Sequence, residues 1–286
     1  KESLVTQLND SVFALPNNSP TLTMLFEEQV QGNAEKIALS MGDQCLTYDE
    51  LNRRANQLAR QLLSLGAKQG DLIGVCLERS PLLIVALLGV QKIGAAYVPI
   101  DPDYPSHRVA YMIEDSRAHI LITDSNNASN IDSLDSKYQV LGLDINTLDK
   151  FSSGNLDCPL SSELPAYVIY TSGSTGNPKG VQISQGALVN FLLTMSDQPG
   201  ISSTDRLLTV TTISFDIAGL EIYLPLISGA EVVMVDRSTA SDGGQLLDAI
   251  GKHNATILQA TPITWRLLLA AGWNGNGLNQ IWCGDR

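Results

Sequence analysis

The sequence predicts an α/β fold in which βαβ units stack in layers around mainly parallel sheets. Short apolar runs rich in β-branched residues alternate along the chain with longer segments of helical periodicity, as they do in βαβ units. The chain has 286 residues, of which 44% are hydrophobic and 17% are charged. This length and composition allow two mid-sized domains or one large domain with a sizeable core.

The N-terminal part predicts a linker followed by two helices. Residues 1–20 include "ALPNNSP", a mixture of Pro, Asn and Ser without a period, which is typical of a linker. Thr21 or Thr23 begins the first helix, whose segment "MLFEEQVQGN" runs to a glycine. The clearest helix is "LTYDELNRRANQLARQLLSLG", which ends at Gly66. Its apolar residues recur at helical spacing: Leu51, Ala55, Leu58 and Leu62.

Strands and helices alternate in the next part of the chain. The predicted strands are "DLIGVCL", "AAYVPI" and "AHILIT", and the helices between them are "PLLIVALLGVQKIG" and "SHRVAYMIEDS". Residues 124–165 are polar and irregular, apart from a possible strand at "YQVLGL". We expect this segment to form an excursion on the surface.

The alternation then resumes with the strand "AYVIY" and the helix "SQGALVNFLLTM", which Ser184 caps. The later strands are "LLTVT", "EVVMV", "ATILQ" and "LNQIWC". The helices among them are "DIAGLEIYLPLISG", "DGGQLLDAIGKH" and "PITWRLLLAAG". The sequence therefore predicts two interleaved α/β subdomains, at roughly 21–165 and 166–286.

Charge and composition argue against several classes of partner. The net charge of −12 makes non-specific binding to nucleic acid or to an anionic membrane unfavourable. The longest apolar run, residues 82–90, is too short to span a bilayer, and the N-terminus lacks the apolar core of a signal peptide.

Cysteine and histidine usage predicts a reduced cytoplasmic protein without zinc. The four cysteines are far apart and form no CxxC pair, so we expect thiols that mostly fill the core. The three histidines show no metal-ligand spacing.

The segment "YTSGSTGNPKG", residues 170–180, predicts a loop that binds phosphate. Its spacing does not match the dinucleotide-binding fingerprint G-x-G-x-x-G, because Gly173 and Gly176 are three apart. It does not match the P-loop G-x-x-x-x-G-K-[ST] either, because Lys179 is followed by Gly180. Glycines nevertheless let backbone N–H groups approach an anion, and a lysine supplies a compact charge. Hydroxyl donors complete the set: Thr171, Ser172, Ser174 and Thr175. The alternative is a turn whose composition provides only flexibility.

Several stretches in order resemble the adenylate-forming enzymes, which include acyl-CoA synthetases, luciferases and the adenylation domains of nonribosomal peptide synthetases. "AYVIYTSGSTGNPKGVQIS" is similar to the phosphate-loop signature of that superfamily. "LTYDELNRRANQLA", "QKIGAAYVPIDPDYP", "FDIAGLEIYLPLISGA" and "LQATPITW" resemble motifs of the adenylation domains, and "LNDSVFALP" looks like the linker after a condensation domain. The resemblance runs from about residue 5 to 284. It implies that residues 21–286 are the large N-terminal core of an adenylation domain, without the small C-terminal domain.

The resemblance also implies a function. Such a domain uses ATP and Mg²⁺ to activate an amino acid as an aminoacyl-adenylate. It then passes the acyl group to the phosphopantetheine thiol of a peptidyl carrier domain, next to an upstream condensation domain. The residues implied at the ATP phosphates are Thr171, Ser172, Gly173, Ser174, Thr175, Gly176 and Lys179. Of these, Lys179 and Thr175 are implied to be catalytic.

The implied amino-acid site begins with Asp216, which holds the substrate ammonium in the family. Its implied pocket residues are Ile217, Leu220, Gln259, Trp282 and Gly284. This set resembles the pattern for glycine, in which bulky apolar residues fill the space of a side chain. Trp282 should close the pocket further, whereas Gly284 could leave a hole deeper in. We therefore expect glycine or another very small amino acid.

Each of these residues also has a structural interpretation. Asp216 could simply cap a helix, and in the substrate-binding interpretation we expect its carboxylate to be buried and to need a partner. Ile217, Leu220 and Trp282 are residue types that usually lie in a core, but Gln259 at the end of an apolar strand is harder to explain that way. Lys92 and the turn at 101–105 match a family motif and are interpreted as structural.

The sequence departs from the family at several points. Gln185 replaces a frequent His, Ala218 replaces a Ser, and the final "CGDR" differs from C-G-G-E. The later family motifs carry the adenine-stacking aromatic, the acidic Mg²⁺ ligand, the ribose-binding Asp and a catalytic Lys. They are not among these residues, so the metal ligands stay unknown and we expect this chain by itself to be inactive.

Two alternatives stay open. The first is an acyl- or aryl-acid:CoA ligase, against which Asp216 argues because a simple acid has no ammonium group. The second is a non-catalytic nucleotide-binding fragment.

Overall fold

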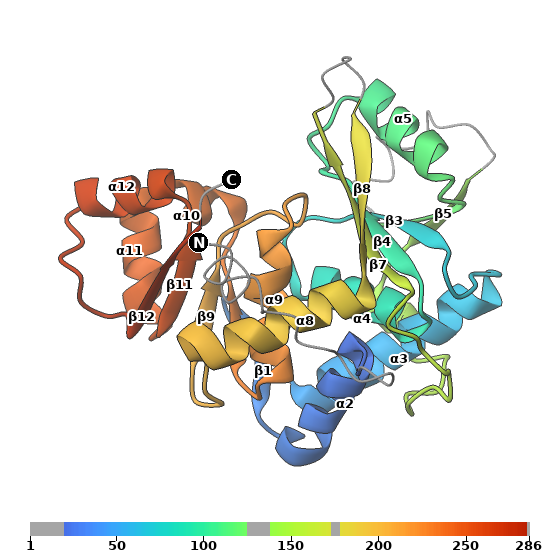
Figure 1. Ribbon diagram of the computed structural model, residues 1–286, viewed down its shortest axis with the longest axis horizontal. Helices are drawn as coiled ribbons and strands as arrows, with labels where there is room; N and C mark the ends of the chain where they lie inside the picture. The colour runs from blue at the N-terminus through green and yellow to red at the C-terminus, as the bar shows by residue number, and fades with distance from the viewer. Residues whose placement is uncertain (1–19, 125–137, 173–177, 285–286) are drawn as a thin grey trace, which may run out of the picture.

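The computed structural model describes residues 20–124, 138–172 and 178–284, and these form two sheets with helices between and outside them (Figure 1). Within the described residues each sheet has six strands. Sheet A has the order β12-β11-β9-β10-β1-β2, and sheet B has the order β6-β5-β3-β4-β7-β8. The α/β class with mainly parallel sheets, predicted from the alternation of strands and helices, is confirmed.

Sheet B is parallel except at one edge. Its strands are β3 (Leu72–Cys76), β4 (Ala96–Pro99), β5 (Ile120–Thr123), β6 (Gln139–Gly142), β7 (Pro165–Thr171) and β8 (Lys179–Ser184). The last two pair antiparallel as a hairpin, and β7 joins the rest of the sheet through β4. The strand expected at "YQVLGL" is present as β6, and a short helix, α7 (Ile145–Leu148), follows it.

Sheet A is also parallel except at one edge. Its strands are β1 (Ile37–Met41), β2 (Gln44–Thr47), β9 (Arg206–Thr209), β10 (Glu231–Met234), β11 (Ile257–Ala260) and β12 (Gln280–Cys283). The hairpin β1–β2 was missed in the sequence. It joins this sheet by pairing β1 with β10 in parallel.

The division expected near residue 165 does not coincide with the division between the sheets. The hairpin β7–β8 lies after that residue but belongs to sheet B, and the hairpin β1–β2 lies before it but belongs to sheet A. The periodicity of a strand indicates which face is buried but not which strand it pairs with, so the sequence could not place these two hairpins.

The helices pack between the two sheets and on their outer faces. Those between the sheets are α2 (Leu22–Asn33), α3 (Tyr48–Ser64), α4 (Pro81–Lys92), α8 (Gln185–Met195) and α9 (Ile217–Ile227). One large core cluster joins these helices to the inner faces of both sheets. The outer face of sheet B packs on α5 (Ser106–Ser116), and that of sheet A packs on α11 (Gly243–Lys252) and α12 (Pro262–Ala270). A short helix that the sequence did not predict, α10 (Arg237–Ser241), precedes α11.

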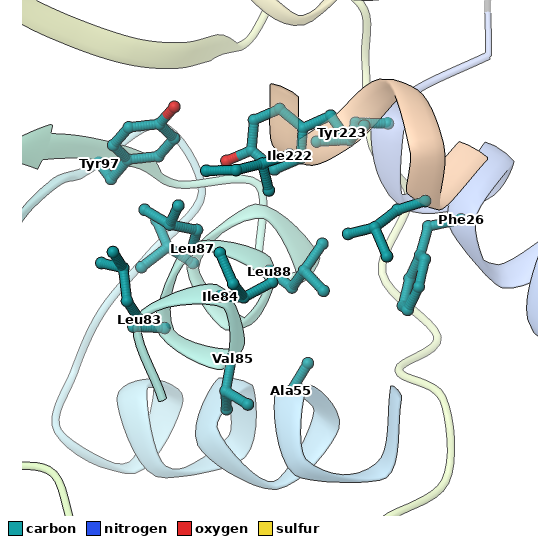
Figure 2. Close-up of a cluster of buried hydrophobic side chains, with 14 of the residues drawn as sticks. Phe26, Ala55, Leu83, Ile84, Val85, Leu87, Leu88, Tyr97, Ile222 and Tyr223 are labelled. Atoms are coloured by element: carbon teal, nitrogen blue, oxygen red, sulfur yellow. The ribbon is translucent and has the colours of Figure 1, made fainter. Parts of the chain in front are cut away.

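Helix α4 is the centre of the core. Ten of its twelve residues are buried, because apolar side chains surround its whole circumference. Figure 2 shows α4 packed against Ala55 of α3 on one side and against aromatic side chains, including Tyr97 and Tyr223, on the other. Gly89 lets α3 approach closely, since a Cβ there would lie 2.9 Å from Leu58 Cδ2.

Side-chain caps set the helix starts as the sequence indicated. Thr21, not Thr23, caps α2, and the Ser184 hydroxyl accepts a hydrogen bond from the Ala187 amide at the start of α8. Gly66 follows α3 with a φ of 92°, a conformation that favours glycine. The glycine expected to stop α2 does not do so, because the helix continues through Gly32 to Asn33.

Lys92 and the four cysteines differ in how far the structure agrees with their expected roles. Lys92 is buried and forms an ion pair with Glu27 across α4 and α2, which agrees with a structural role. All four cysteines lie in the described part of the chain and are free, but Cys45 and Cys283 are exposed. Cys76 is buried and Cys158 is half-buried, so the expectation that the thiols mostly fill the core is wrong. Cys45 and Cys283 face outward on the edge strands β2 and β12.

No helix among the described residues is both long and apolar enough to cross a membrane. Over the same ranges, the structure contains no group of three or more His, Cys, Asp or Glu side chains arranged to hold a metal ion.

Candidate functional site

A cavity of about 660 Å³ lies at the carboxyl ends of three parallel strands of sheet A. Its wall is formed by the segments that follow β9, β11 and β12, by α12, and by α8 and the neighbouring strands of sheet B. Ligands bind in this position in open α/β sheets, because the loops leaving adjacent parallel strands meet there. The cavity therefore lies where the architecture favours a binding site.

The two sides of the cavity differ in chemistry. Toward sheet B the wall is apolar and aromatic, with Ile183, Leu188 and Phe191. Toward sheet A it carries hydroxyl, amide and carboxylate groups, from Thr211, Thr212, Ser241, Thr261, Thr264, Gln259 and Asp216. An apolar wall facing a few polar groups is typical of sites for small molecules.

Asp216 stands at the start of α9 and lines the cavity. Its Oδ1 accepts a hydrogen bond of 2.8 Å from the amide of Ile217, so it also caps the helix. The side chain is exposed, which makes the expectation of a buried carboxylate wrong. The physical reason is that only Asp216 and Ile217, at the very start of α9, reach the cavity, whereas the helix is buried from Ala218 onward.

Tyr167 of β7 faces the same space. Burial raises the pKa of the Tyr167 phenol to about 12, and the negative charge of Asp216 adds to this rise. Both residues line the cavity, although Tyr167 comes from β7 of sheet B and Asp216 from the start of α9. Little in the sequence pointed to Tyr167, which is one of two tyrosines in β7.

Gln259 at the end of β11 is buried and lines the cavity. Its Oε1 has no hydrogen-bond partner within the described parts of the chain. A Cβ placed on Gly284 would lie 2.8 Å from Gln259 Nε2. The expected hole beside Gly284 is therefore occupied by this amide, and that expectation is corrected.

The structure brings together Asp216, Ile217, Gln259 and Gly284, but it separates two other predicted residues from them. Leu220 and Trp282 are buried in the large core cluster and are not part of the cavity wall. The Trp282 indole donates a hydrogen bond to Gln280 Oε1 at 2.9 Å. Their interpretation as core residues agrees with this placement.

The predicted phosphate loop connects the two strands of the β7–β8 hairpin. Thr171 and Lys179 are partners in the ladder, and Thr171, Ser172 and Lys179 are exposed. The Tyr111 hydroxyl of α5 donates a 3.2 Å hydrogen bond to the Pro178 carbonyl and holds the second strand end. The other predicted loop residues lie outside the described part of the chain: Gly173, Ser174, Thr175 and Gly176. The described loop residues do not line the cavity.

Comparisons with known proteins agree on one family. The family model described as "AMP-binding enzyme" matches residues 26–284. A dimodular nonribosomal peptide synthase of Bacillus subtilis is 39% identical over 274 residues, which are 95% of this chain and 11% of that protein. Tyrocidine synthase 3 of Brevibacillus parabrevis is 38% identical over 288 residues, which cover 99% of this chain and 4% of that protein.

Two solved structures are similar over most of the chain. One is a four-domain nonribosomal peptide synthetase bound to AMP and glycine, with a TM-score of 0.80 and 32% identity over 96% of this chain and 20% of that chain. The other is the nonribosomal peptide synthetase FmoA3 bound to AMPPNP, with a TM-score of 0.85 and 28% identity over 94% of this chain and 28% of that chain. This chain thus spans only a small part of the proteins that it matches.

Proposed function

The chain belongs to the family of AMP-binding enzymes, and from this premise we propose that it activates an amino acid with ATP in nonribosomal peptide synthesis. In the proposed reaction the substrate carboxylate attacks the α-phosphate of ATP. An acyl–phosphate anhydride bond forms and pyrophosphate leaves. The product is an aminoacyl-adenylate.

The observation that carries this proposal is the carboxylate of Asp216 on the polar side of a cavity whose opposite wall is apolar. A substrate with an α-ammonium group supplies the opposite charge, and the pair becomes stronger when the ligand excludes water. A simple acyl or aryl acid has no group to pair with this carboxylate. The proposal therefore favours an amino acid over the substrate of an acid:CoA ligase.

Lys179 and the hydroxyls of Thr171 and Ser172 are proposed to contact the phosphates. All three are exposed at the ends of the hairpin strands, so a nucleotide can reach them without rearrangement of the core. A cation there stabilises the negative charge that grows on the leaving pyrophosphate. The proposal extends this role to the loop residues between them, including Thr175. It assigns no protein ligand to the Mg²⁺ that accompanies ATP.

We propose glycine or another very small amino acid as the substrate. The Gln259 amide fills the space beside Gly284, and this limits the room for a side chain. Support also comes from the similar synthetase that was solved with AMP and glycine. The whole cavity is larger than glycine, so we propose that it receives the adenylate rather than the amino acid alone.

The acyl group would then leave the adenylate for a thiol. We propose a phosphopantetheine thiol on a peptidyl carrier domain, with AMP as the leaving group and an upstream condensation domain as a neighbour. The much longer synthases that this chain resembles support this context. The need for ATP favours the cytoplasm as the location.

The test is amino-acid-dependent ATP–pyrophosphate exchange with the full-length source protein. Each of the twenty amino acids is assayed beside acetate and glycolate, the des-amino and hydroxy analogues of glycine. We expect exchange with glycine and very little with the analogues. Equal rates with acetate would support the CoA ligase instead. Phe, Tyr or Arg as the best substrate would overturn the size argument, and no exchange with any acid would overturn the proposed activity.

A further inference from the structure

We propose that Arg79 and Glu221 are positioning residues that clamp the backbone at the carboxyl end of β9 and thereby fix Asp216 at the cavity. The inference rests on the proposed function for the identity of the ligand. It concerns the fully buried Glu221 and the half-buried Arg79, neither of which belongs to the amino-acid pocket predicted from the sequence.

Glu221 holds the amides of this segment. Its side chain is fully buried in α9, and its Oε2 accepts hydrogen bonds from the amides of Val210 at 2.8 Å and Thr211 at 3.0 Å. Its Oε1 accepts a hydrogen bond from the Thr211 hydroxyl. A buried carboxylate without partners would be very unfavourable, so these contacts are a requirement of the fold and not incidental.

Arg79 holds the carbonyls of the same segment. Its guanidinium donates hydrogen bonds to the carbonyl of Thr211 at 2.7 Å and to the carbonyl of Thr209 at 2.8 Å. It also reaches the Thr209 hydroxyl at 2.9 Å and the Val235 carbonyl at 2.8 Å. Arg79 lies between β3 and α4, so it ties sheet B to the ends of two strands of sheet A.

Glu221 therefore binds N–H groups, and Arg79 binds carbonyl groups, of the same backbone segment, residues 209–211. Burial lowers the pKa of Arg79 and raises that of Glu221, and the attraction between them opposes both changes. Lysine could not replace this arrangement, because only the planar fork of arginine reaches several carbonyls in fixed directions.

The clamped segment continues into the wall of the cavity. Val210, Thr211 and Thr212 line it directly, and the chain then leads to Asp216 and into α9. Glu221 sits on that same helix, so its bonds to the end of β9 close residues 210–221 into a ring. Loosening the ring would let the Asp216 carboxylate leave its place on the cavity wall. A site whose carboxylate is already held in place does not lose free energy by ordering it when the ligand binds.

Stability alone does not explain the buried Glu221 and its half-buried partner Arg79. Replacing such groups with apolar residues of similar size is often neutral or even stabilising. What the charges provide is a defined path for a loop that has no regular secondary structure. Glu231 of β10 has a different position. It forms an ion pair with Arg206 at the start of β9, and neither of these residues lines the cavity.

The experiment compares Glu221→Gln and Arg79→Lys with the control Glu231→Gln in the full-length source protein. Two readouts are used: hydrogen–deuterium exchange of peptides covering residues 209–217, and the KM values for the amino acid and for ATP. We expect both clamp variants to exchange faster in 209–217 and to raise the amino-acid KM about tenfold, with the ATP KM changed less than about twofold. The control should lower the melting temperature without either effect.

The outcomes separate the inference from the proposed function. Unchanged exchange in 209–217, or equal rises in both KM values that match those of Glu231→Gln, would overturn the clamp. If the parent protein activates no amino acid, the proposed function fails, and the hydrogen exchange alone still decides whether the clamp exists. If Glu221→Gln does not fold, Arg79→Lys carries the test.

Discussion

The two sheets present functional residues in different ways. In sheet B the described strand ends of the antiparallel hairpin β7–β8 are exposed and bear hydroxyls and the cation of Lys179. In sheet A three parallel strands end side by side, and the segments that follow them enclose a cavity. A single hairpin loop offers charge and backbone N–H groups, whereas several converging loops can define a shape. The hairpin of sheet B thus presents exposed hydroxyls and a cation, whereas the strand ends of sheet A form an enclosed cavity with the Asp216 carboxylate on its wall.

The largest expected effect comes from the hairpin. Lys179→Ala should slow adenylate formation by about 30- to 1000-fold, because a charge-assisted contact to the leaving group contributes about 2–4 kcal/mol to the transition state. The measurement is ATP–pyrophosphate exchange at saturating substrates. Lys179 is exposed, so the free energy of unfolding should change by less than about 0.5 kcal/mol. The exposed Lys68→Ala is the control, and an unchanged rate in Lys179→Ala would remove the role from this loop.

Asp216→Asn should raise the KM for the amino acid by about 10- to 100-fold, since a hydrogen bond to a charged group contributes about 1.5–3 kcal/mol. The effect stays below that of a buried charge pair, because the carboxylate is exposed before the ligand binds. Asp242→Asn is the control, since Asp242 also caps a helix, α11, where it accepts a 2.8 Å hydrogen bond from the amide of Gln245. Equal changes in the two variants would reduce Asp216 to a helix cap.

Gln259→Ala should change the preference for side-chain size. Removing the amide that fills the space beside Gly284 should improve activation of alanine relative to glycine by about tenfold, the usual contribution of one methylene in a pocket. Competition between the two amino acids measures this ratio. Gln57→Ala, which removes another buried glutamine in α3, should leave the ratio as it is. A fixed ratio in Gln259→Ala would mean that this residue does not set the size limit.

The smallest expected effect lies at the opposite end of sheet A, just before β9. Burial raises the pKa of the Asp205 carboxyl, but hydrogen bonds from Thr256 and Ser202 outweigh it and hold the pKa below its ordinary value of 3.8. The charged form is therefore favoured in the folded state. Its stabilisation is present above about pH 4 and is lost as the pH falls through the folded pKa.

Asp205→Asn should accordingly cost about 1 kcal/mol of unfolding free energy at pH 7 and less with falling pH. Urea unfolding at several pH values measures this difference, with the exposed Asp43→Asn as the control. The KM values should stay as they are, because this end of the sheet is away from the cavity. A difference that is constant with pH would contradict the assigned role of the charge.

The sequence predicted the fold class and most elements because fully buried parallel strands appear as short, continuous apolar runs. The hairpin β1–β2 was missed because its strands are short and mix polar with apolar residues. For the site, helix spacing placed Asp216 at the start of α9 but provided no measure of its exposure.

The sequence could not separate cavity from core within α9. This helix is apolar on all sides, so its periodicity does not show that Ile217 lines the cavity and Leu220 the core. Glu221 did leave a signal, as the one charge in "IAGLEIYLPLI". A buried charge needs partners, but the sequence does not show which of the 18 Lys and Arg residues provides one.

The pairing of β1 with β10 has a consequence for synthesis on the ribosome. Leu39 pairs with Val232, roughly 190 residues later in the chain. At a translation rate of about 5–20 residues per second, the first hairpin waits about 10–40 s for its partner strand to emerge. During that time the edge of β1 is free to pair with other nascent chains. Slowed translation before residue 231 should therefore favour aggregation, whereas a permuted chain that begins after residue 47 and appends 20–47 at its end would shorten the wait.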